Sequence, residues 1–299
     1  MVEPDADGFV AFSWPLDLPL TLAPISHGRG DPTIRFEPGA IWRATRTPAG
    51  AATLLLRAAR GGVSVTAWGP GASAAVELAA DLVGAHDDPS ALVPQHRLIG
   101  ELVRRLPGLR LPRTNRPFEA LLPAICEQKV TGVEARAAFR GIVATYGEPA
   151  PGPIQLRLPP PAEALAALPY FAFHRFGLER RRADLIRRAA QLAPRIEGAS
   201  MHEAYARLGA VPGIGPWTLA EVGRIAFGDP DALSIGDFHL PNLVSWALAR
   251  QPRADDARML ELLEPYRGQR GRVQRLLEAS GIRPPRYGPR MAPQPIADI

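Results

Sequence analysis

The sequence predicts an α+β protein in which a small antiparallel sheet unit precedes a larger, mostly helical unit. Residues 33–68 contain short β-branched and aromatic segments separated by Pro- and Gly-rich turns, which is typical of antiparallel strands. From about residue 90, apolar residues recur at helical spacing and capping patterns appear. We therefore expect an N-terminal α+β domain over 1–88, a helical domain over 89–282 and an extended basic tail over 283–299.

The composition is that of a globular protein with a substantial core. Of 299 residues, 46% are hydrophobic and 22% charged. No long apolar run indicates a membrane span, and the acidic N-terminus lacks a signal-type apolar segment. The single cysteine, Cys126, excludes a disulfide within the chain and a cysteine-ligated metal or iron–sulfur site. We expect a cytoplasmic monomer with no metal site and no membrane partner.

The net charge of +5 is modest, but arginines cluster in residues 173–190 and 265–277. Clustered arginine on helical segments is compatible with a surface that faces a polyanion. A solvated, salt-bridged helix face explains each cluster equally simply.

The first unit is expected to contain strands at 33–37, 40–46, 53–59 and 63–68. A helix over 73–86 should follow, with Ser73 as its cap and Gly84 as its end.

In the second unit, the patterns predict helices over 96–106, 117–128, 131–147, 178–193, 200–210, 216–227, 238–248 and 271–280. Pro117 and Pro216 suit first-turn positions. Thr131 with Glu134, and Ser200 with Glu203, are spaced as capping boxes.

The segment "VPGIGPWT" (211–218) places a sharp turn between two of these helices. Glycine permits a positive φ and close backbone approach, and the helix that begins at Pro216 leaves its first N–H groups free. Such a turn is a potential anion site made of backbone donors, which suits a DNA phosphate. Judged alone, the two glycines are better explained as a tight turn between helices.

Nineteen residues beyond the turn stands "SIGDFHL" (234–240), with Asp237 at the start of a helix. The order "LGAVPGIGPWTLAEV", short loop, "SIGDFHL" resembles the helix-hairpin-helix–GPD superfamily of DNA glycosylases, in particular its alkylpurine (3-methyladenine type II) branch. "PFEALLPAICEQKVTG" (117–132) and "GLERRRADLIRRAAQLA" (177–193) also resemble segments of that superfamily. The resemblance covers about residues 10–280 and implies a glycosylase core preceded by the additional α+β domain of that branch.

The resemblance implies an enzyme of base excision repair that flips out and hydrolytically excises alkylated purines from double-stranded DNA. Asp237 would be the catalytic carboxylate, although it could also simply cap the following helix. Trp217 occupies the position that is a Schiff-base lysine in lyase-competent members, so a monofunctional glycosylase is expected. The alternative is a non-catalytic helix-hairpin-helix protein that binds distorted or abasic DNA.

The expected lesion pocket comprises Trp217, Gln128, Tyr170, Phe171 and Glu221, of which the resemblance itself implies Gln128. Trp217 could stack on the extruded base or pack in the core behind the hairpin. Tyr170 and Phe171 could form a wall of the pocket, although such aromatic clusters are more often core, as we expect for Phe173 and Phe176. Glu221 could favour a cationic base or be a solvated side chain. The expected contacts to the DNA backbone come from Gly213, Ile214, Gly215 and Thr218. Lys129 would be the wedge, in place of the usual bulky apolar residue, or a solvated side chain. No cofactor is expected to be required, and the hairpin carbonyls could hold a monovalent cation.

Overall fold

The computed structural model describes residues 2–285, so most of the predicted tail at 283–299 lies outside the described residues. Its N-terminal part is a five-stranded antiparallel sheet in the order β1-β5-β4-β3-β2. The strands are β1 (Ala6–Ala11), β2 (Ile34–Glu37), β3 (Ala40–Thr47), β4 (Gly50–Ala59) and β5 (Gly62–Trp68). The four predicted strands are confirmed, and β1 is an additional edge strand paired with β5.

The helix predicted over 73–86 is wrong in detail. The chain forms two short helices, α2 (Ala72–Glu77) and α3 (Ala79–Leu82). The N-cap residue of α2 is Gly71, which makes no side-chain capping bond, so Ser73 is not the cap. Gly84 does follow the helical turns, with a φ of +73°. Helix α1 (Leu18–Leu22) was not predicted; Asp17 caps it by accepting a hydrogen bond from the Leu20 amide.

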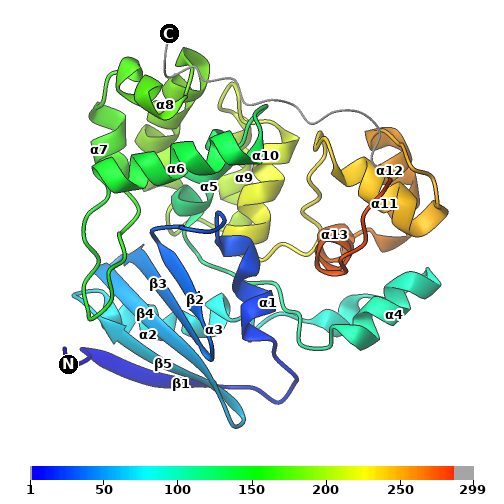
Figure 1. Cartoon of the computed structure of the whole chain (residues 1–299), viewed down its shortest axis with the longest axis horizontal. Helices are drawn as coiled ribbons and strands as arrows, with labels where there is room; N and C mark the ends of the chain where they lie inside the picture. The colour runs from blue at the N-terminus through cyan, green and yellow to red at the C-terminus, as the bar shows by residue number, and fades with distance from the viewer. Residues whose placement is uncertain (1, 286–299) are drawn as a thin grey trace.

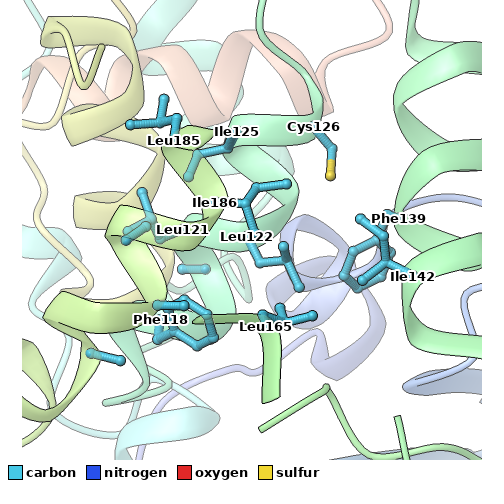
Figure 2. Packing of buried hydrophobic residues seen from close by; sticks show 14 of the residues in the cluster. Phe118, Leu121, Leu122, Ile125, Cys126, Phe139, Ile142, Leu165, Leu185 and Ile186 are labelled. Carbon is cyan, nitrogen blue, oxygen red and sulfur yellow. The ribbon is translucent and has the colours of Figure 1, made fainter. Parts of the chain in front are cut away.

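The central helices enclose the largest core. They are α5 (Pro117–Cys126), α6 (Gly132–Tyr146), α7 (Ala162–Ala167), α8 (Arg180–Ile196), α9 (Met201–Gly209) and α10 (Pro216–Val222). Both predicted capping boxes are present. Figure 2 shows side chains from α5, α6, α7 and α8 directed toward one another, with Cys126 buried among them.

A second helical group has a core of its own. It consists of α4 (Arg97–Arg105), α11 (Leu240–Ala249), α12 (Asp256–Leu263) and α13 (Arg270–Ala279). In Figure 1 this group lies to the right of the central helices, and the sheet lies below them. Short helical turns complete the fold: η1 (Ala23–Ile25), η2 (Pro89–Ala91), η3 (Tyr170–Phe176), η5 (Glu264–Tyr266) and the wider π-helical turn η4 (Gly223–Phe227).

Asp237 lies on the connection between the two helical groups, after α10 and η4 and before α11. Within residues 2–285, no helix has both the length and the apolar character needed to cross a membrane.

Candidate active site

The hairpin between α9 and α10 has the sharp geometry that its glycines predict. Gly213 has a φ of +103°, and a Cβ there would lie 3.2 Å from Leu185 of α8. Gly215 is different, because it is extended, with φ −100° and ψ −177°, and a Cβ there would meet nothing within 4 Å. The Ile214 side chain is buried in the central core and anchors the hairpin from below.

Helix α10 begins without a side-chain cap. Gly215 is the N-cap residue and Pro216 occupies the first turn, as predicted. The N–H groups at this end are therefore available to an anion. Of the predicted contacts to the DNA backbone, Ile214 and Thr218 have buried side chains and can contribute only main-chain groups. The two hairpin glycines have no side chain and also contribute only main-chain groups.

Gln128 joins the α5–α6 turn to this hairpin. Its Nε2 donates to the Gly213 carbonyl at 3.0 Å and to the Thr218 hydroxyl at 2.9 Å. The amide thus holds two predicted elements of the site together. The next residue, Lys129, is exposed and has a φ of +56°, a strained conformation for a residue with a side chain.

The Asp237 carboxylate is fixed by three hydrogen bonds. Its Oδ1 accepts from the backbone N–H groups of His239 at 2.7 Å and Leu240 at 2.8 Å, at the start of α11. Its Oδ2 accepts from Trp217 Nε1 at 3.3 Å. The side chain is half-buried. Asp237 therefore does help to cap the helix, and the capping bonds orient one oxygen while the other lies beside α10.

The loop that carries Asp237 is held at several points. Tyr205 donates to Asp229 at 2.7 Å. Asp231 accepts from Arg270 side-chain and backbone groups at the start of α13. The buried Ser234 backbone N–H donates to Gln274 Oε1 at 3.1 Å. These contacts fix the part of the loop that leads to Asp237, which is the pre-organisation that electrostatic catalysis requires.

A cavity of about 130 Å³ lies between the sheet unit and the central helices. Glu221, one helical turn after Trp217 on α10, lines it, together with Ile225 of the π-helical turn. His27, from the loop between η1 and β2, and Glu127, just before Gln128, line the other sides. Trp217, which donates to Asp237, and Glu221, which lines the cavity, lie one turn apart on α10, whereas Asp237, Trp217 and Gln128 are not among the residues that line the cavity.

Burial dominates the electrostatics around this cavity. It raises the pKa of Glu221, although the neighbouring Arg224 guanidinium and the Ser234 hydrogen bond act in the opposite direction. Arg224 is held between Glu221 and Glu278, whose charges keep its pKa above the ordinary value. Burial likewise raises the pKa of the Cys126 thiol to about 12, so that thiol is not a nucleophile.

Tyr170 and Phe171 lie in η3, which packs against α6 and α8. The Tyr170 ring contacts Phe171, His174 and the Arg180 guanidinium. Among the contacts described for residues 2–285, none joins either aromatic residue to Asp237, Trp217 or the cavity. Their assignment to the lesion pocket therefore stays a prediction. The other predicted members, Gln128, Trp217 and Glu221, lie on α10 or bond to it, and only Glu221 of these lines the cavity. Phe173 is buried and Phe176 is partly buried in the core, as expected.

Sequence reasoning missed three residues of this region. His27 and Glu127, whose side chains lie 3.6 Å apart, reach the cavity from segments distant in sequence. Phe238, beside Asp237, is 83% exposed, and its ring packs edge-on against His239. An exposed aromatic next to a candidate catalytic acid is a signal that the sequence did offer.

Comparison with known proteins places this geometry in a wider context. No protein-family model matches the sequence. The probable bifunctional transcriptional activator/DNA repair enzyme AlkA of Mycobacterium tuberculosis is 30% identical over 166 residues, which cover 51% of this chain and 32% of the relative. The chain thus spans about a third of the length of the curated relatives it matches.

Solved structures share the whole architecture. The 3-methyladenine DNA glycosylase of Archaeoglobus fulgidus superposes with a TM-score of 0.75 at 19% identity, covering 91% of this chain and 97% of that one. The 8-oxoguanine glycosylase/lyase of Clostridium acetobutylicum, in complex with double-stranded DNA, gives 0.69 at 13% identity over 93% and 100% of the two chains. The predicted resemblance to DNA glycosylases is confirmed at the level of the fold, which these two enzymes share.

Proposed function

We propose that this protein is a monofunctional DNA glycosylase that excises alkylated, 3-methyladenine-like purines from double-stranded DNA during base excision repair. The observation that carries the proposal is the Asp237 carboxylate, oriented by three hydrogen bonds beside the helix that follows the hairpin. The similarity to AlkA and to the Archaeoglobus enzyme supports the same activity.

The reaction breaks the bond between C1′ of the deoxyribose and the purine nitrogen. The electron pair of that bond leaves with the base, so positive charge develops on the sugar. The Asp237 Oδ2 oxygen, placed near C1′, would stabilise this charge, and water would add to C1′ and lose a proton. A purine alkylated at a ring nitrogen is already cationic and leaves as a neutral base, so a single carboxylate suffices.

The hairpin and the α5–α6 turn would hold the DNA. A phosphate would bind the free N–H groups around Gly215 and the start of α10, which fixes register without reading sequence. Lys129, exposed on the turn that Gln128 ties to the hairpin, would enter the space left by the extruded nucleotide. We also propose that the hairpin carbonyls hold a monovalent cation and that the protein is a cytoplasmic monomer.

Lyase activity is not expected, because Trp217 stands where a Schiff-base amine would be needed. Lys129 is the only lysine of the chain. We expect borohydride treatment during turnover to trap no covalent protein–DNA adduct. Without alkali treatment, the product strands should remain intact at the abasic site. A trapped adduct that disappears in Lys129→Ala would contradict this part of the proposal.

The deciding experiment incubates the protein with methylated duplex DNA and measures released bases by mass spectrometry. We expect Asp237→Asn to lower the release rate by about 100-fold or more, the order found when a pre-organised electrostatic contact is removed. Asn can still cap a helix, so the fold should persist.

The matched control is Asp255→Asn. Asp255 caps α12 by accepting from the Arg258 amide at 2.9 Å, far along the chain from the hairpin. The Asp255→Asn substitution should leave the rate of base release unchanged. If wild-type protein binds methylated or abasic duplex but releases no base, the chain is a non-catalytic DNA-binding protein. If Asp237→Asn and Asp255→Asn are both as active as wild type, Asp237 is only a helix cap.

A further inference from the structure

Glu221 lines the cavity with a carboxylate whose two oxygens are used differently. Oε1 accepts hydrogen bonds from the Ser234 hydroxyl and from Arg224, the latter at 3.1 Å. Within residues 2–285, no donor is recorded for Oε2, while the side chain keeps 22% of its surface exposed. One oxygen therefore fixes the carboxyl group, and the other is available at the cavity wall.

The cavity wall carries an excess of negative groups. Arg43 and Glu119 neutralise each other through a buried ion pair at 3.0 Å. Glu127 remains, with His27 as its near neighbour, and Glu127 acts on Glu221 as a like charge. Arg224 lies behind Glu221, but it is shared with Glu278. A positive guest would relieve this imbalance, whereas a neutral guest would only displace solvent from the acidic groups.

Building on the proposed function, we propose that Glu221 makes the base pocket a charge filter, which admits purines carrying a positive charge and disfavours neutral bases of the same shape. Glu221 lies one turn beyond Trp217 on the same face of α10, so its carboxylate would face a base whose sugar is at Asp237. Glu221 is thus a specificity-determining residue. The substrate class is cationic N-alkylpurines, and neutral lesions would be poor substrates.

A purely structural role for Glu221 makes a different prediction. Glu221, Arg224, Ser234, Gln274 and Glu278 form one buried polar network, and removing any charge could weaken the fold. Glu278 is the matched control, because it binds the same Arg224 at 2.6 Å but does not line the cavity. A structural effect should appear in Glu278→Gln as well as in Glu221→Gln.

The test measures binding to two duplexes that differ only in the charge of one base. One contains 7-methylguanine, which is cationic, and the other contains 7-methyl-7-deazaguanine, which has the same outline and hydrogen-bonding edge but is neutral. A 2′-fluoro sugar in both prevents cleavage by destabilising the cationic sugar. Fluorescence anisotropy gives the ratio of the two dissociation constants.

We expect wild-type protein to prefer the cationic duplex by at least about tenfold, which corresponds to about 1.4 kcal/mol. Glu221→Gln should bring the ratio close to one, and Glu278→Gln should leave it at the wild-type value. Equal ratios in wild type and Glu221→Gln, or the same loss in both variants, would overturn the proposal. Binding does not require turnover, so an inactive protein with this preference would contradict the glycosylase proposal and leave the charge filter standing.

Discussion

The two hairpin glycines offer a test that separates folding from DNA contact. Gly213 has a φ of +103° and faces Leu185 at the distance where a Cβ would be tight, 3.2 Å. Alanine there must adopt a sparsely populated backbone conformation, which costs about 1–3 kcal/mol. For a chain of this size, such a loss lowers the melting temperature by roughly 2–5 °C. Gly213→Ala should therefore be measurably less stable in thermal unfolding.

Substitution of Gly215 should affect DNA binding and leave the melting temperature unchanged. Its φ of −100° and ψ of −177° suit any residue, and no atom lies within 4 Å of the point that a Cβ would occupy. Gly215→Val should leave the melting temperature unchanged but fill the space in front of the free N–H groups. Hydrogen bonds to a charged phosphate contribute about 1.5–3 kcal/mol, so binding should weaken roughly 10- to 100-fold.

Fluorescence anisotropy with unrelated duplexes, at several salt concentrations, completes this test. Binding should weaken equally for all sequences, because the contact is to the backbone. The slope of affinity against salt should stay at the wild-type value, since no cationic side chain is removed. If Gly215→Val binds as tightly as wild type, the hairpin does not hold a phosphate. If Gly213→Ala has the same melting temperature as wild type, the strain argument is wrong.

Two further predictions concern stability. Gln128→Leu removes both hydrogen bonds to Gly213 and Thr218 and should lower the free energy of unfolding by about 1–3 kcal/mol, measured by urea titration; an unchanged midpoint would contradict this. Burial raises the pKa of Glu197 to about 7 despite the Arg116 guanidinium, so the folded state binds its proton more tightly than the unfolded chain does. The contribution of Glu197 to the free energy of unfolding should therefore be fully present below pH 4.5 and should fall by about 1–3 kcal/mol as the pH rises through 7. Glu197→Gln should remove this part of the pH dependence.

Elements whose signals lie within a few residues could be predicted from the sequence. The two capping boxes and the first-turn prolines were confirmed because each involves atoms of one helical turn. Strand β1 was missed because "ADGFVA" has no strong strand pattern and is stabilised by pairing with β5, as in the pair Ala6 and Ala67. Such distant pairing overrides weak local preference.

The site divides in the same way. Asp237 and Trp217 could each be named from the sequence, but the hydrogen bond between them could not, because it joins residues 20 positions apart. The cavity could not be foreseen, because His27 reaches it only when the sheet unit packs against α5 and α6. Gln128 was expected to line a pocket, and its observed bonds to the hairpin depend on tertiary packing that no local pattern encodes.

Helix α10 and its π-helical extension explain why distant parts of the chain must cooperate at one carboxylate. Gly223 begins the π turn, and a Cβ there would overlap the Tyr205 hydroxyl, so glycine lets α9 pack this closely. That hydroxyl in turn holds Asp229, the start of the loop to Asp237. Within the same turn, Arg224 reaches Glu278 of α13. The loop that carries Asp237 is therefore positioned by α9 and α13 as well as by α10, and substitution of Tyr205 or Arg270, which bind this loop directly, should alter the site without touching DNA.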